Sequence, residues 1–180
     1  MRPTRRVLTA LLGAAAAAGL ALSSAPAAQA SSAPTSTGDA RTSQQSPQVL
    51  AKLTHAQATA KFRSAGITWT SSGGCSDRNK PNCTSFDQLN SATADGAATL
   101  KSASKCAVKL TGGTETGHAS GTYSHWNGYK LDMSLSSCLD NYIKGTFTSI
   151  GGSKWKSGSG NIYYREGNHW DVTYYNCGGC

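Results

Sequence analysis

The cysteines constrain the fold of this chain more than any other feature. All six lie at or beyond position 75 of the 180 residues. An even number of cysteines in a chain with an export signal is typical of a disulfide-bonded domain. The most local set of pairs is Cys75–Cys83, Cys106–Cys138 and Cys177–Cys180. The Cys-Gly-Gly-Cys at 177–180 also suggests a zinc-thiolate or redox motif, but export and the terminal position favour a disulfide there.

The first 48 residues are expected to lie outside the folded domain. Residues 1–30 have the basic start, apolar run and small-residue cleavage site ("AQA") of a secretory signal peptide. Arg5 and Arg6 leave the twin-arginine route open beside ordinary secretion. Residues 31–48 are poor in large apolar side chains and predict a disordered Ser/Thr/Pro-rich spacer. Residues 49–180 are therefore expected to form the single domain of a secreted, extracellular bacterial protein.

The charge of the secreted part limits its partners only loosely. Removing three arginines with the signal peptide leaves 14 basic and nine acidic residues, a net charge of +5. A moderately basic secreted protein is retained by anionic polymers such as teichoic acids, peptidoglycan or nucleic acid. The basic residues are scattered, without the run that is typical of a nucleic-acid-binding arm. We expect no specific nucleic-acid partner, and no stretch after residue 30 is apolar enough to span a membrane.

Two helices are expected at the start of the domain. The first covers residues 53–67, with Thr54 as its N-cap and Gly66 as its stop. Its residues expected to face the core are Ala56, Ala60 and Phe62. The second covers residues 84–104 and is capped by Thr84 or Ser85. Its apolar stripe, at steps of three and four, is Phe86, Leu89, Thr93, Ala97 and Leu100.

Strands dominate the rest of the chain. Alternating patterns predict strands at 106–113 and 128–135, and one or two strands at 161–176, broken at Gly167. Residues 137–147 are expected to form a short helix. The predicted fold class is therefore α+β: a small, disulfide-bonded single domain with N-terminal helices packed on a mainly antiparallel sheet.

The candidate site comes from the strand periodicity of residues 128–135. If Leu131 and Met133 face the core, then Lys130 and Asp132 face the other side of the sheet. His125 precedes this strand on a turn and could reach the same face. If residues 128–135 pair with the last strand, His169 lies beside Asp132, and Glu166 stands three residues upstream across Gly167.

Two imidazoles and one carboxylate suit a zinc ion with an open fourth position. Zinc lowers the pKa of a bound water toward neutrality, and a nearby carboxylate that is not a ligand takes its proton. Glu166 is the candidate for that role. The alternative is an ordinary surface, on which Asp132 pairs with Lys130 and Glu166 with Arg165 as exposed ion pairs.

Two separated motifs resemble a known family. "SHWNGYKLD" (124–132), followed by "EGNHW" (166–170), is similar to the signature of the zinc D-alanyl-D-alanine carboxypeptidases. That superfamily includes vancomycin-resistance D,D-peptidases, phage L-alanyl-D-glutamate endolysins and the hedgehog domain. The resemblance covers residues 84–176. It implies that His125, Asp132 and His169 are zinc ligands and that Glu166 is the general base.

The chain departs from the family pattern at two places. Lys130 stands where the pattern has alanine, and residues 110–118 lack the arginine that helps to bind the substrate in that family. We expect Lys130 to supply the missing cation. His118 lies in a glycine-rich loop facing the site, where it could polarise the scissile carbonyl, support a ligand or be a plain loop histidine. Trp126 and Trp170 are expected to pack beside the ligands, with sugar or peptide stacking as a second role.

The sequence therefore predicts a secreted, monomeric zinc metallopeptidase that acts on the stem peptides of peptidoglycan, as a D,D-carboxypeptidase or an endopeptidase. One alternative is a non-catalytic zinc- or wall-binding module of the same fold, which the missing arginine favours. Another is a small basic ribonuclease that uses Glu166 with His118 or His169 as acid and base. The ribonuclease would explain the charge and the disulfides, but not the position of Asp132.

Overall fold

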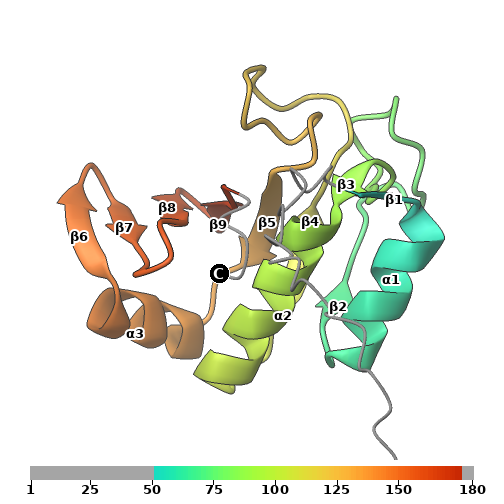
Figure 1. Ribbon diagram of the computed structural model, residues 1–180. Helices are drawn as coiled ribbons and strands as arrows, with labels where there is room; N and C mark the ends of the chain where they lie inside the picture. The colour runs from blue at the N-terminus through green and yellow to red at the C-terminus, as the bar shows by residue number, and fades with distance from the viewer. Residues whose placement is uncertain (1–50, 176–180) are drawn as a thin grey trace, which may run out of the picture. The chain divides into compact units, whose positions relative to one another are not determined.

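The structure, a computed structural model, describes residues 51–175 (Figure 1). The chain divides into two units, residues 1–44 and 45–180, and every described residue belongs to the second. The predicted signal peptide (1–30), the predicted spacer (31–48) and the predicted Cys177–Cys180 disulfide lie outside the described residues.

The described residues form three helices and nine strands. The helices are α1 (His55–Ser64), α2 (Ser91–Ser104) and α3 (Ser137–Thr146). The strands are β1 (Lys52–Leu53), β2 (Thr68–Trp69), β3 (Leu89–Asn90), β4 (Lys109–Gly112), β5 (Lys130–Ser134), β6 (Thr148–Gly151), β7 (Lys154–Lys156), β8 (Ile162–Glu166) and β9 (His169–Thr173). The predicted helix at 137–147 and the predicted break at Gly167 are confirmed, whereas the sequence did not predict β1, β2, β3, β6 or β7.

Seven of the strands make one sheet in the order β2-β4-β5-β9-β8-β7-β6. Only the β2–β4 pair is parallel, and β1 and β3 form a separate antiparallel pair. The predicted class, a small α+β domain with a mainly antiparallel sheet, is confirmed. The strands β5 and β9 lie at the centre of the sheet as direct antiparallel neighbours, which is the pairing that the candidate site requires.

Helix α1 begins where the sequence predicts it. The side chain of Thr54 accepts a hydrogen bond from the backbone of Gln57, whose own side chain accepts from the backbone of Thr54, so the first turn is capped on both sides. The buried residues of this helix are Ala58, Thr59 and Phe62. The prediction that Ala56 and Ala60 face the core is wrong, because both lie two positions from Ala58 and so point toward solvent.

Helix α2 begins at Ser91, with Asn90 as N-cap, so its predicted start at residue 84 is wrong. The preceding segment is held in another conformation by tertiary hydrogen bonds. The hydroxyl of Thr84 donates to the carbonyl of Thr111, and Gln88 has a left-handed φ of +63°, which a helix does not tolerate. All five residues of the predicted apolar stripe are nevertheless buried, although only Thr93, Ala97 and Leu100 lie on α2. The other two buried members of the stripe are Phe86 and Leu89.

One face of the sheet packs on the helices and forms a continuous core. Leu131 and Met133 of β5 contribute to it, and both are fully buried. Helices and strands meet in this cluster, which contains Phe62 of α1, Ala97 and Leu100 of α2, Ile143 of α3 and Val172 of β9. Because side chains alternate along a strand, the residues between these core positions point to the opposite face of the sheet.

Two disulfides confirm two of the predicted pairings. Cys75 is bonded to Cys83, with Cα atoms 4.8 Å apart, and Cys106 is bonded to Cys138, with Cα atoms 5.7 Å apart. The first closes the loop between β2 and β3, and the second joins the segment after α2 to the first turn of α3. Within residues 51–175, no helix is both long enough and apolar enough to cross a membrane.

Candidate metal centre

Asp132 occupies a central strand on the face that points away from the core. It lies between the buried residues Leu131 and Met133, and only 6% of it is exposed. In the β5–β9 register, Asp132 is opposite Asp171, and Ser134 is opposite His169. Asp132 and His169 are therefore diagonal neighbours on the same face of the sheet, as the sequence predicts.

His125 comes from the long connection between β4 and β5, residues 113–129. The turn that carries it closes with a hydrogen bond from the backbone of Gly128 to the carbonyl of His125, 2.8 Å. Gly128 has a φ of +77°, and an added Cβ would lie 2.4 Å from the carbonyl oxygen of Gln88. Its own carbonyl accepts a 2.8 Å hydrogen bond from the hydroxyl of Thr93. The turn before β5 thus requires glycine at 128 and anchors His125 to helix α2.

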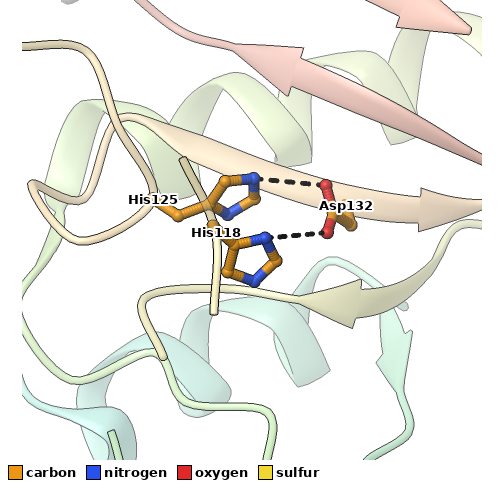
Figure 2. Close-up of side chains that lie close together, drawn as sticks. All are labelled: His118, His125 and Asp132. Atoms are coloured by element: carbon orange, nitrogen blue, oxygen red, sulfur yellow. Dashed lines mark ion pairs between the residues drawn. The ribbon is translucent and has the colours of Figure 1, made fainter. Parts of the chain in front are cut away.

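Three histidines surround the carboxylate of Asp132. The distance from His125 Nε2 to Asp132 Oδ1 is 3.3 Å, and that from His118 Nδ1 to Asp132 Oδ2 is 3.7 Å (Figure 2). The rings of His118 and His125 are stacked, with centroids 3.8 Å apart. One ligand atom from each of these three residues lies within 4.8 Å of the other two, so the group could hold a metal ion. His169 Nε2 approaches from β9 and lies 3.5 Å from Asp132 Oδ1.

The ring nitrogens that face away from Asp132 are all engaged. His125 Nδ1 donates to the carbonyl of Gly113 over 2.6 Å, and His169 Nδ1 to the side-chain oxygen of Asn168 over 3.0 Å. His118 Nε2 lies 3.3 Å from Glu115 Oε1. In the neutral rings, these hydrogen bonds place the proton on the outer nitrogen, so that the lone pair of the inner nitrogen is free for a metal. Metal-binding histidines are commonly oriented by partners of this kind.

Glu115 supports the centre without facing it. It is 3% exposed, and its carboxylate accepts hydrogen bonds from the backbone of Ser85, 2.8 Å, and of Gly113, 3.0 Å. The same carboxylate is the partner of His118. One buried acid therefore fixes both the start of the β4–β5 connection and the ring of His118. The hydrogen bond to Glu115 also raises the pKa of His118. The negative charges of Asp132, Glu115 and Asp171 add to this effect, and together they outweigh burial, which lowers the pKa.

Asp132 is prepared for a positive charge. Burial by itself raises the pKa of this carboxyl, but His125, with His169 and His118, outweighs burial when the imidazoles are protonated and holds the pKa of Asp132 below the usual value. Oδ1 of Asp132 is buried and makes no hydrogen bond to any described residue. A buried carboxylate oxygen without a hydrogen bond, faced by nitrogen lone pairs, is the environment of a cation. Nitrogen and oxygen donors in this number suit zinc.

Glu166 lies where the sequence places it, at the end of β8. It faces His169 across a two-residue turn in which Gly167 has a φ of +51°. The distance from Glu166 Oε2 to His169 Nε2 is 3.8 Å, and 51% of the Glu166 side chain is exposed. A carboxylate in this position is open to solvent and to a ligand, yet close to the metal group.

Lys130 lies on the same face as Asp132 but is bound elsewhere. Its Nζ is 2.6 Å from Oδ2 of Asp171, the residue opposite Asp132. Arg165 contacts Asp140 over 3.2 Å. Neither of the alternative surface pairs, Asp132 with Lys130 or Glu166 with Arg165, is therefore present among the described ion pairs.

The two tryptophans next to the histidines do not both lie beside the ligands. Trp170 is fully buried on the core face of β9 and donates a 2.9 Å hydrogen bond to Asp140, so its prediction is wrong. The reason is strand alternation, which turns Trp170 away from His169. Trp126 is 43% exposed and stacks on the guanidinium of Arg78, 3.5 Å from the ring centroid.

Sequence reasoning missed Glu115, Asn168 and Gly112 and left His118 undecided. A signal for His118 was nevertheless present. The spacing Glu-x-x-His occurs twice, at 115–118 and at 166–169, and in both cases the acid lies within 4.0 Å of the histidine. Gly112 has no such signal, because only the register of β4 against β5 brings it beside Asp132.

The chain matches no protein-family model, and comparisons with curated proteins and with solved structures find no similar protein.

Proposed function

We propose that this protein is a secreted zinc metallopeptidase that hydrolyses peptide bonds in peptidoglycan stem peptides. The observation that carries the proposal is the convergence of three imidazoles on the buried carboxylate of Asp132, with Glu166 beside them. The substrate class is supported by the resemblance of residues 124–132 and 166–170 to the zinc D-alanyl-D-alanine carboxypeptidases. Asp132 of the first motif and His169 of the second lie on the same face of the sheet.

His125, Asp132 and His169 are the proposed ligands, and His118 is a further candidate on the other side of the carboxylate. Zinc bound there would supply Lewis-acid chemistry, by making a water molecule more acidic and by polarising an amide carbonyl. Asp132 would contribute a negative charge from a rigid strand. The inner nitrogens of His125 and His169 would face the metal, because the outer nitrogens are engaged by Gly113 and Asn168.

Glu166 would act as the general base. Arg165, the neighbouring cation, is engaged by Asp140 and forms no ion pair with Glu166 among the described residues. From the end of β8, Glu166 would take a proton from the attacking water and give it to the leaving amine. The short turn to His169 keeps the base at a constant distance from the ligand set.

The ion pair between Lys130 and Asp171 bears on the type of peptidase. A carboxypeptidase needs a cation for the terminal carboxylate of its substrate, and we expected Lys130 to provide it. Asp171 already neutralises Lys130 at 2.6 Å. This contact favours an endopeptidase, whose substrate continues beyond the cut and needs no such cation. A stem peptide with an amidated C-terminus should then be cleaved as fast as the free acid, whereas a carboxypeptidase would cleave the free acid faster.

The first experiment is elemental mass spectrometry of the secreted protein after dialysis. We expect about one zinc per chain, as in a catalytic site with an open position. Peptidoglycan fragments are then incubated with the protein, with and without a chelator, and the products are separated by mass. Folded protein that takes up no zinc when it is offered would refute the proposal.

The second experiment separates catalysis from metal binding. Glu166→Gln should retain zinc and lose activity by about 10²–10⁴-fold, the usual contribution of a general base. Asp95→Asn, which changes an exposed acid on α2, is the matched control and should keep both. Full activity of Glu166→Gln would remove Glu166 from the mechanism.

Zinc binding without any hydrolysis, in the native protein, would identify a non-catalytic module instead. Activity that resists chelation would favour the ribonuclease alternative.

A further inference from the structure

A hollow lies apart from the metal group, beside the Cys75–Cys83 disulfide. Its volume is about 400 Å³, and its walls come from α1, from the end of β2 and from the disulfide loop. Ligand sites in proteins are typically hollows of this size. None of the proposed metal ligands lines it. The hollow is therefore a candidate for a separate binding event.

The charge of the hollow has one sign. Arg63 is the only Lys, Arg, Asp or Glu side chain that lines it, and Arg63 takes part in none of the ion pairs among residues 51–175. The guanidinium carbon lies 4.9 Å from the ring centroid of Trp69. Stacking on an aromatic ring fixes the plane of a guanidinium while leaving its N–H groups available. An anion, and a carboxylate in particular, is the natural partner of such a group.

The ring of His55 supplies a second hydrogen-bond donor to the hollow. The backbone of Phe86 donates a 3.1 Å hydrogen bond to His55 Nδ1, so the neutral ring carries its proton on Nε2. Burial lowers the pKa of His55 below its usual 6.5, although the charge of Asp87 opposes this shift. Because the pKa is lowered, the ring is neutral at pH 7. His55 thus presents an N–H donor from the wall formed by α1.

Hydroxyl groups make up much of the remaining wall. Thr70, Ser71 and Ser76 all line the hollow. The hydroxyl of Ser71 is used to hold the disulfide loop, 2.8 Å from the carbonyl of Cys75, whereas those of Thr70 and Ser76 make no hydrogen bond to the described residues. A wall of hydroxyls with one indole suits a ligand that is itself rich in hydroxyls and has one apolar face, which describes a sugar.

We propose that this hollow binds a sugar acid, with the carboxylate on Arg63 and the sugar ring against Trp69 and the hydroxyl-bearing residues. The site is independent of the proposed peptidase activity, because none of its residues is a proposed ligand or the proposed base. Both sites nevertheless lie near the C-terminal ends of neighbouring strands. The strands β2 and β4 are parallel, Trp69 ends β2 at the hollow, and Gly112 ends β4 beside Asp132. Binding there would hold an acidic polysaccharide close to the metal centre.

The test uses sodium D-glucuronate as the probe and D-glucuronamide as its neutral match. Each is titrated into the ¹⁵N-labelled secreted protein, in the presence of a chelator so that the metal centre plays no part. We expect glucuronate to shift the amides of residues 69–76 and the indole N–H of Trp69, with an affinity at least about tenfold higher than that of the amide, as for a hydrogen-bonded charge. No shift of these signals at about 10 mM glucuronate would overturn the proposal. Equal affinities for the two probes, or shifts confined to other residues, would also overturn it.

Variants give an independent check. Arg63→Gln should reduce glucuronate binding to the level of glucuronamide, since it removes the charge and keeps a polar side chain. Lys61→Gln is the matched control, because Lys61 lies on the same helix but is paired with Asp95 at 2.6 Å. That control should bind glucuronate as the native protein does. Both positions are exposed, and circular dichroism checks that each variant is folded. Undiminished binding by folded Arg63→Gln would refute the role of the guanidinium.

Discussion

Replacing Gly112 by alanine is the sharpest test of how the sheet positions the metal group. Gly112 is the last residue of β4, next to Asp132 on β5. An added Cβ would lie 2.4 Å from Oδ2, 3.0 Å from Cγ and 3.1 Å from Cβ of Asp132. The φ of Gly112 is not in the left-handed region, so the substitution acts through this contact alone. The clash involves the whole Asp132 side chain and cannot be relieved by a small rotation of its end.

The size of the effect follows from these distances. Non-bonded atoms settle about 3.5 Å apart, so the carboxylate has to retreat by roughly 1 Å. Displacing a ligand or its support typically lowers metal affinity by about 10–100-fold. Overpacking a buried site should also lower the free energy of unfolding by about 1–3 kcal/mol. Gly112→Ala should therefore lose both zinc affinity and stability.

The assay is a zinc titration against a competing chelator, together with urea unfolding of the metal-free protein. Gly145→Ala on α3 is the matched control, because no described residue outside the adjacent helix backbone has an atom within 4 Å of the added Cβ. The control should bind zinc normally and gain about 0.5–1 kcal/mol from replacing a helical glycine. If Gly112→Ala binds zinc as tightly as the native protein, the carboxylate of Asp132 is not held where the metal needs it, and the reasoning fails.

Three further predictions concern stability. Replacing Cys106 and Cys138 by serine should lower the free energy of unfolding by about 4 kcal/mol. Replacing Cys75 and Cys83 by serine should lower it by about 2.5 kcal/mol, because this pair closes the shorter loop. Denaturant unfolding that gives the opposite ranking would contradict this prediction. Because the pKa of His55 is depressed in the folded protein, its contribution to the free energy of unfolding is complete above pH 6.5 and is lost as the pH falls through the folded pKa. An NMR titration of the His55 ring should therefore give a midpoint below 6.5, and a midpoint above that value would contradict the prediction. Zinc at 100 times its dissociation constant should stabilise the protein by about 2.7 kcal/mol, and a melting temperature that does not respond to a chelator would argue against a bound metal.

The site was predictable wherever local periodicity determined the geometry. Alternation along residues 128–135 was enough to put Asp132 opposite the core, and the same rule put His169 on the matching face of the last strand. The turn that carries His125 before β5 was also predictable, since the hydrogen bonds of Asn127 and Gly128 that close it involve neighbouring residues. Both disulfides between described cysteines follow from the preference for short loops.

Tertiary contacts determine the features that the sequence did not predict, namely the start of α2 and the position of His118. Thr84 and Ser85 have the composition of helix caps, but they bond to Thr111 and Glu115 from other parts of the chain, and α2 starts later. His118 lies in a connection without periodicity, so its approach to Asp132 depends on the buried carboxylate of Glu115. Such partners are distant in sequence, and no local pattern specifies them.

The hydrogen bonds behind the imidazoles also bear on the rate of metal exchange. His125 is held by a backbone carbonyl and His118 by a carboxylate that is itself fixed to two backbone amides. These hydrogen bonds therefore hold the imidazole rings in the same orientation without a metal ion, and no loop has to become ordered before an ion binds. Because the site would need no rearrangement to bind, differences in affinity between variants should appear mainly in the rate of release. If the group binds a metal, weakening an outer hydrogen bond should shorten the residence time of that metal, even where the proposed ligands themselves are unchanged.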